Sequence, residues 1–192
     1  KFSQGRGLEV YMFLKSLGSR FMQFMPVVEH VKYPTDAKGK MNKRLRPFIV
    51  SPSTEGAMLS PWSISDIAYG NFMCDIFDYW VRNDVGRYYV NLFDATLANW
   101  CGAMPGTCVH ARVCGGNAVI EHNGDLYPCD HFVYPEYLLG NIRENDIKTL
   151  MQSQKQTDFG LDKRSALPTK CARCKYLFAC NGECPKHRFN RT

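Results

Sequence analysis

The chain has 192 residues, enough for one domain or a little more. Hydrophobic residues make up 45% and charged residues 22%, as in an average globular protein, which excludes a disordered tail or a low-complexity linker. No stretch approaches the roughly 18 apolar residues of a membrane span, and the first residues lack the apolar core of a signal peptide. Nine cysteines without a secretory signal therefore favour metal or redox chemistry over disulfides.

The net charge of +6 is concentrated in one segment. Residues 163–192 contain eight Lys or Arg and one acid, so they carry +7, and the rest of the chain sums to −1. The same segment holds four cysteines. A basic segment can bind nucleic acid, but four thiolates around a 4Fe–4S core of about +2 leave about −2 to be compensated. Because the charge and the cysteines coincide, we favour the second interpretation.

The first third of the chain predicts a helix, a strand and a loop. Apolar residues at three-residue spacing from Leu8 to Leu17 indicate a short helix, which Gly18 would end. Residues 21–28 (FMQFMPVV) form a short apolar run that is typical of a buried parallel strand. Residues 31–55 show no helical period and predict a solvated polar loop rich in lysine.

A second helix and strand follow. Ser63 and Ser65 are candidate N-caps for a helix with a wide apolar face over residues 69–81, and residues 87–93 (RYYVNLF) predict a strand. This order is that of a parallel α/β layer. Because two strands cannot form a stable α/β domain alone, we expect the last units of a barrel or an open sheet from a larger protein.

The second half changes character. Residues 118–122 and 125–129 flank Asn123-Gly124, the strongest short signal for a β-hairpin. Asn145 is a candidate cap for a modest helix over residues 147–151. The cysteine-rich segment after Pro168 leaves little room for regular structure.

Seven of the nine cysteines fall into two groups. The first group is Cys108, Cys114 and Cys129, and the second is Cys171, Cys174, Cys180 and Cys184. Two thiolates separated by two residues can bind one metal centre, but spacings of two, five and three suit two neighbouring centres that share ligands, as in iron–sulfur proteins. A structural zinc site is the main alternative, and disulfides are a weaker one. Cys74 and Cys101 lie outside both groups, and we expect them to be packed apolar thiols.

The spacing from Cys114 through Gly124 and Cys129 to the second group resembles the SPASM domain of radical S-adenosylmethionine enzymes. The segments NLFDATLANWC (91–101), PCDHFVYPEY (128–137), NGECPKHRF (181–189) and FMQFMPVVE (21–29) resemble the anaerobic sulfatase-maturating enzymes. The resemblance implies an α/β fold: the last strand–helix units of a partial TIM-type barrel (1–100), then a small α+β SPASM domain with a β-hairpin and cysteine-rich loops (101–192).

The resemblance also implies an activity. Such enzymes oxidise a Cys or Ser of a sulfatase to formylglycine, using S-adenosylmethionine, three 4Fe–4S clusters and a flavodoxin- or ferredoxin-type electron donor in the cytoplasm. It implies that Cys108, Cys114, Cys129 and Cys184 hold one auxiliary cluster, and that Cys171, Cys174 and Cys180 hold the other with one further Cys. Asp130, which follows the third cysteine, would accept the proton of the substrate thiol or hydroxyl. A carboxylate fixed beside a cluster ligand is also suited to this role on general grounds. We expect His131 to be a structural histidine.

Two departures from the family pattern matter. No CxxxCxxC occurs, so the radical-generating cluster and most of the S-adenosylmethionine site are expected upstream of Lys1, and no Cys follows Cys184. We therefore expect this portion alone to be inactive and its second cluster to lack one ligand. The alternatives are another SPASM peptide-modifying enzyme and, in a different class, a zinc-binding interaction module with a basic face.

Overall fold

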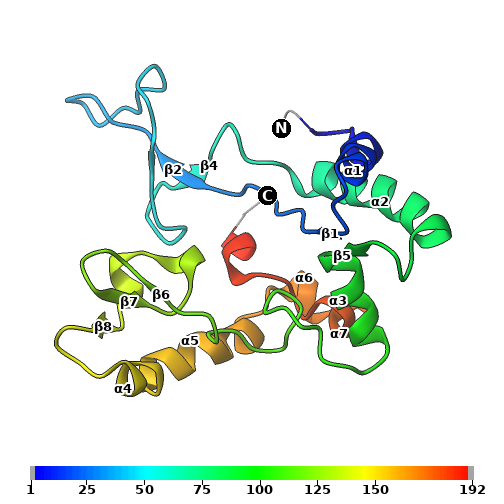
Figure 1. Ribbon diagram of the computed structural model, residues 1–192. Helices are drawn as coiled ribbons and strands as arrows, with labels where there is room; N and C mark the ends of the chain where they lie inside the picture. The colour runs from blue at the N-terminus through cyan, green and yellow to red at the C-terminus, as the bar shows by residue number, and fades with distance from the viewer. Residues whose placement is uncertain (1–2, 190–192) are drawn as a thin grey trace. The chain divides into compact units, whose positions relative to one another are not determined.

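The computed structural model describes residues 3–189 and divides the chain into two compact units (Figure 1), residues 1–94 and 95–192. In the first unit, α1 (Gly7–Ser16) packs against α2 (Asp66–Asn83), and β1 (Phe21–Met22) pairs in parallel with β5 (Tyr89–Val90). The predicted helix, the predicted parallel pairing and the predicted second helix are therefore present. The core between these elements contains Tyr11, Met22, Phe72, Met73, Ile76, Trp80, Val90 and Phe93.

Both predicted strands are shorter than the apolar runs that indicated them. Pairing along residues 21–28 is limited to Phe21 and Met22, which lie opposite Tyr89 and Val90. The run at 87–93 gives only β5, because α3 (Asn91–Trp100) begins directly after it. A strand of two residues is too short to show the alternating apolar pattern that separates a strand from the start of a helix.

The segment that we predicted as a polar loop contains a small antiparallel sheet. Its strands are β2 (His30–Lys32), β3 (Phe48–Ile49) and β4 (Met58–Leu59), in the order β3-β2-β4. Val31 is fully buried at its centre and pairs with both neighbours. The prediction of a plain loop was wrong because each strand is too short to show an alternating pattern.

The prediction for the start of α2 is confirmed. Ser65 is the N-cap, in extended conformation, and its side chain accepts a hydrogen bond from the backbone N–H of Ala68. Ser63 instead accepts from the Glu29 backbone N–H at 2.9 Å. Of the two candidate caps, Ser65 alone caps the helix, and Ser63 ties the preceding loop to the residue before β2.

The second unit contains the predicted hairpin as part of a three-stranded antiparallel sheet. Its strands are β6 (Val119–Ile120), β7 (Asp125–Tyr127) and β8 (Gly140–Asn141), in the order β6-β7-β8. Gly124 in the turn has φ +92°, a backbone conformation that glycine adopts at little cost and other residues rarely adopt. The short 3-10 helices η1 (Asp130–Phe132) and η2 (Pro135–Tyr137) connect β7 to β8.

Helices joined by turns follow the sheet in the second unit. They are α4 (Ile147–Met151), α5 (Gln154–Ser165), α6 (Thr169–Ala172), α7 (Leu177–Cys180) and the 3-10 helix η3 (Pro185–Phe189). The cap of α4 is Asp146, one residue after the predicted Asn145, and α5 was not predicted at all. Among residues 3–189, none of these helices or of those in the first unit has the length and apolar content needed to cross a bilayer.

Candidate functional site

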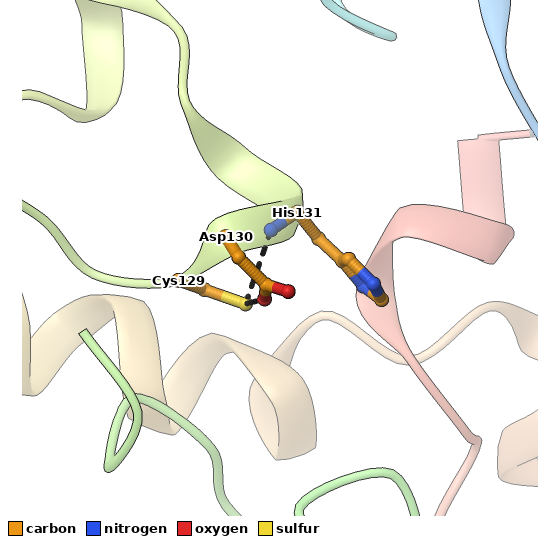
Figure 2. A group of neighbouring side chains, drawn as sticks. All are labelled: Cys129, Asp130 and His131. Carbon is orange, nitrogen blue, oxygen red and sulfur yellow. Dashed lines mark hydrogen bonds between the residues drawn. The ribbon is translucent and has the colours of Figure 1, made fainter. Parts of the chain in front are cut away.

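The turn after β7 brings Cys129, Asp130 and His131 together. Cys129 has an extended backbone (φ −165°) and is the N-cap of η1, where its Sγ accepts a hydrogen bond from the His131 backbone N–H at 3.5 Å. Pro128 before it and Phe132 after it are both buried, so the turn is held on both sides. In Figure 2 the Cys129 sulfur and the Asp130 carboxylate face each other, and the His131 ring extends away from them.

Aromatic packing of Phe132 fixes the position of this turn. The Phe132 ring, only 2% exposed, lies edge-on to Tyr137 and to Phe159, with ring centroids 4.9 and 5.1 Å apart. Phe159 belongs to α5, so a helix far along the chain fixes the position of the turn. The buried ring holds η1 in place, and the Asp130 side chain next to it stays exposed.

The three side chains of the turn form a compact donor group. Their ligand atoms lie within 4.8 Å of one another, and the Cys129 thiol donates to Asp130 Oδ1 at 3.2 Å. The pKa of Cys129 is raised to about 12, chiefly by burial and also by the neighbouring Asp130, while the His131 backbone N–H acts to lower it. The thiol therefore keeps its proton at neutral pH until a metal centre binds the sulfur and displaces the proton.

The four cysteines expected to hold the first cluster share one neighbourhood. Burial raises the pKa of Cys184 to about 11, and the nearby thiols of Cys108 and Cys114 contribute to this rise. Cys108 likewise contributes to the raised pKa of Cys114, and Cys184 contributes to that of Cys129. His131 joins the group, since its Nδ1 lies 3.4 Å from Cys184 Sγ. The fold thus gathers thiols that are up to 76 residues apart in the sequence.

The spacing of these thiols bears on the choice between zinc and a cluster. Ligands of one tetrahedral zinc, at Zn–S about 2.3 Å, lie about 3.8 Å from each other. Within residues 3–189, Cys129, Asp130 and His131 are the only group of three or more donors closer than 4.8 Å. No three of the four thiols therefore lie within 4.8 Å of one another, and a 4Fe–4S cluster, in which each iron takes one thiolate, does not need them to. An all-thiolate donor set also fits iron–sulfur chemistry.

The cysteines expected to hold the second cluster lie on two short helices and in the turn between them. Cys171 is in α6, and its carbonyl accepts the Cys174 backbone N–H at 3.0 Å in the turn that follows. The Cys174 sulfur accepts the Tyr176 backbone N–H at 3.4 Å. Cys180 ends α7, where Asn181 adopts the left-handed conformation with φ +50°. Charge on Cys171 and on Cys180 acts on the same guanidinium, that of Arg188, so both thiols are near it.

Helix α5 supports the first set of cysteines, and no sequence signal pointed to it. The Cys114 backbone N–H donates to the Gly160 carbonyl at 3.2 Å, and the Gln156 side chain donates to the carbonyl of Gly115. A side chain at Gly160 would meet the Cys114 carbonyl at 2.6 Å, so glycine is needed there. Lys163, also on α5, is fully buried and donates to the carbonyls of Cys108 and Val109.

The two cysteines outside the groups are not packed as predicted. Cys74 and Cys101 are both exposed. Cys74 lies on α2 away from the buried face that Phe72, Met73 and Ile76 define, and Cys101 follows the last residue of α3 in an exposed turn. Helical position therefore overrides the usual preference of cysteine for the interior.

Comparison with known proteins identifies the class. Residues 108–175 match the family model of SPASM, an iron–sulfur cluster-binding domain. The second unit thus carries a SPASM domain. A serine-type anaerobic sulfatase-maturating enzyme of Bacteroides thetaiotaomicron is 46% identical over 185 residues, which are 96% of this chain and 43% of that protein. A cysteine-type anaerobic sulfatase-maturating enzyme of Clostridium novyi is 26% identical over 94% of this chain and 42% of its own length.

The fold agrees. The solved structure of native anSMEcpe with bound AdoMet and Cp18Cys peptide superposes with a TM-score of 0.71 at 20% identity, over 96% of this chain and 45% of that one. The chain is similar over nearly its whole length to anaerobic sulfatase-maturating enzymes and spans less than half the length of these relatives. The resemblance seen in the cysteine spacing is therefore confirmed at the level of the family.

Proposed function

We propose that this chain is the C-terminal portion of a radical S-adenosylmethionine enzyme that oxidises a sulfatase side chain to formylglycine. The observation that carries the proposal is the joint match of the SPASM region and of nearly the whole chain to sulfatase-maturating enzymes. When bound, S-adenosylmethionine and its cluster supply the radical that removes hydrogen from the substrate. A flavodoxin- or ferredoxin-type donor in the cytoplasm would deliver the electron, in line with reduced thiols in that compartment.

The first unit would be the end of a partial TIM-type barrel, residues 1–100, and residues 101–192 the SPASM domain. A strand, α2 and a parallel strand in succession form the repeating unit of such a barrel. The first unit also exposes large apolar side chains at Phe21, Met25 and Ile67, with exposed fractions of 76%, 68% and 72%. Exposed apolar surface of this kind is expected where the rest of a larger fold covers it.

Within the SPASM region we propose that Cys108, Cys114, Cys129 and Cys184 hold one auxiliary 4Fe–4S cluster. Cys171, Cys174 and Cys180 would hold a second with one ligand from elsewhere. The mutual pKa effects of the first four thiols support the first assignment. The shared proximity of Cys171 and Cys180 to Arg188 supports the second.

Asp130 is proposed as the group that accepts the substrate proton. Its carboxylate is exposed, on a turn whose backbone is fixed by buried neighbours, and its Oδ1 now accepts the Cys129 thiol hydrogen bond. A metal-bound Cys129 is a thiolate and cannot donate that bond, which leaves Oδ1 available to a substrate hydroxyl. Deprotonation of the substrate oxygen favours loss of hydrogen at the adjacent carbon as a carbonyl forms.

The substrate would be a serine-type sulfatase, since the serine-type relative is 46% identical and the cysteine-type relative 26%. The test offers the full-length protein two sulfatase peptides that differ only by Ser or Cys at the target position. We expect the Ser peptide to be converted to formylglycine faster than the Cys peptide. Mass spectrometry would show the conversion of the Ser peptide as the loss of two hydrogens. If neither peptide is oxidised by a protein that binds its clusters, another SPASM peptide-modifying activity is favoured.

The role of Asp130 has its own test. General-base groups contribute about 10²–10⁴-fold to rate, so we expect Asp130→Asn to lower the rate of formylglycine formation at least 100-fold with iron content unchanged. Asp158→Asn, which removes an exposed carboxylate on α5, is the matched control. An Asp130→Asn rate within tenfold of the unmodified protein would refute the role.

A further inference from the structure

A fully buried lysine lies beside the proposed ligands of the first cluster. The Lys163 side chain is 0% exposed, and its ammonium donates to the backbone carbonyls of Cys108 and, at 2.7 Å, of Val109. Burying an ammonium is costly unless an opposite charge compensates it.

No carboxylate among the described residues forms an ion pair with this ammonium. Within residues 3–189, the ion pairs do not include Lys163, whose hydrogen-bond acceptors are two neutral carbonyl oxygens. The negative groups near it are the Glu183 carboxylate, whose pKa Lys163 helps to lower, and the cysteines. Burial lowers the pKa of Lys163, and the thiols of Cys114, Cys108 and Cys184 oppose this by raising it. Lys163 therefore lies among thiols of the first set, which become anionic when they bind a metal centre.

Arg188 adds a second, half-buried cation near the same cysteines. Its Nη1 donates to the Lys163 carbonyl at 2.6 Å, and its Nε donates to the Gly182 carbonyl at 2.8 Å. Burial lowers the pKa of Arg188, while thiols from both cysteine sets raise it. Lys163 differs in that the thiols acting on it all belong to the first set.

Most of the basic segment cannot play this part. Arg164, Lys170, Arg173 and Lys175 are exposed, so water and salt screen their charges. The basic residues of the segment that are buried or half-buried are Lys163, Lys186 and Arg188, and charge on the thiols acts on Lys163 and Arg188. Of the two, Lys163 is the more buried and also contacts the backbone of a proposed ligand.

We propose that Lys163 is a positioning residue whose buried charge raises the reduction potential of the first auxiliary cluster. This rests on the proposed function, in which the four thiolates hold that cluster. Reduction adds one negative charge to a centre that is already anionic, so a nearby fixed cation stabilises the reduced form. The hydrogen bond to the Cys108 carbonyl keeps the ammonium in place as the electron arrives.

The test compares two replacements in the full-length protein after anaerobic reconstitution. Lys163→Gln removes the charge and keeps an N–H donor for the two carbonyls, whereas Lys163→Arg keeps a permanent charge. Arg164→Gln removes a charge from the adjacent exposed position and is the matched control. The measurements are iron and sulfide content and a potentiometric titration followed by electron paramagnetic resonance. The signal of the first cluster is the one lost in Cys108→Ala.

We expect Lys163→Gln to retain its iron and to lower the ratio of reduced to oxidised cluster about tenfold at fixed potential, which equals 59 mV for one electron. Lys163→Arg and Arg164→Gln should stay within threefold of the unmodified protein. Loss of the cluster from Lys163→Gln with retention in Lys163→Arg also supports a role for the charge.

An unchanged potential in an iron-replete Lys163→Gln protein would overturn the proposal. Cluster loss from both Lys163 variants would overturn it too, because the site would then need the lysine shape rather than its charge. An unmodified protein that binds no iron would instead refute the proposed function, and the colour and iron content distinguish that failure from a failure of the charge proposal.

Discussion

Replacing Gly160 with alanine tests whether the close packing of α5 against the Cys114 backbone fixes the position of this proposed ligand. A Cβ at Gly160 would lie 2.6 Å from the Cys114 carbonyl oxygen, whereas contacts below 3.4 Å are already unusually tight. The Cys114 backbone must therefore move by up to 3.4 − 2.6 = 0.8 Å. Metal–ligand distances tolerate only about 0.2 Å. We expect Gly160→Ala to lose much of the iron of the first cluster.

The same substitution tests two opposing effects on stability. Alanine in a helix interior gains about 0.5–1 kcal/mol over glycine, but overpacking costs about 1–3 kcal/mol. We expect a net loss of about 1 kcal/mol in the free energy of unfolding. Gly70→Ala is the matched control, since Gly70 lies inside α2, is exposed and has nothing within 4 Å of an added Cβ. It should gain about 0.5–1 kcal/mol.

Both proteins would be compared with the unmodified one by iron and sulfide analysis and by urea unfolding. The reasoning is refuted if Gly160→Ala binds a full complement of iron and unfolds at the same urea concentration as Gly70→Ala. Such a result would mean that the Cys114 loop shifts without cost, and that α5 does not fix the position of this ligand.

Two further predictions concern stability. Ser65→Ala removes the side-chain cap of α2 and should cost about 1 kcal/mol in urea unfolding; a change below about 0.3 kcal/mol would show that the cap is dispensable. Burial lowers the pKa of His110 from 6.5, so the unfolded chain binds more protons than the folded chain below that pH. The free energy of unfolding should therefore fall as pH drops from 7 to 5, and fall less in His110→Gln; equal slopes would contradict this.

The parts of the fold that sequence predicted depend on local signals. Asn123-Gly124 specifies the β6–β7 hairpin because its turn needs positive φ, and Ser65 specifies the start of α2 because its side chain can cap it. The sheet of β2, β3 and β4 and the start of α3 were missed. In both cases the strands are two or three residues long, so pairing with a distant partner decides the structure.

The helix α5 was missed for a different physical reason. Its buried positions, Gln156, Gly160 and Lys163, follow helical spacing but are polar or lack a side chain. Hydrophobic periodicity detects a helix only when the buried face is apolar. The cysteine ligands, in contrast, could be predicted from spacing, because metal ligation restricts the residue type directly, and this assignment stays a prediction. What the sequence could not show is which backbone groups hold those cysteines.

The contacts of α5 explain how four distant thiols can share one neighbourhood. Lys163 donates to the carbonyl of Cys108, and Gly160 accepts from the N–H of Cys114. Phe159 packs against Phe132, three residues after Cys129. Arg188, four residues after Cys184, donates to the Lys163 carbonyl. A helix without a single cysteine thus contacts the chain at, or within four residues of, every proposed ligand of the first cluster. Its polar buried face follows from that task, since backbone carbonyls and anionic thiolates need donors and charge rather than apolar side chains.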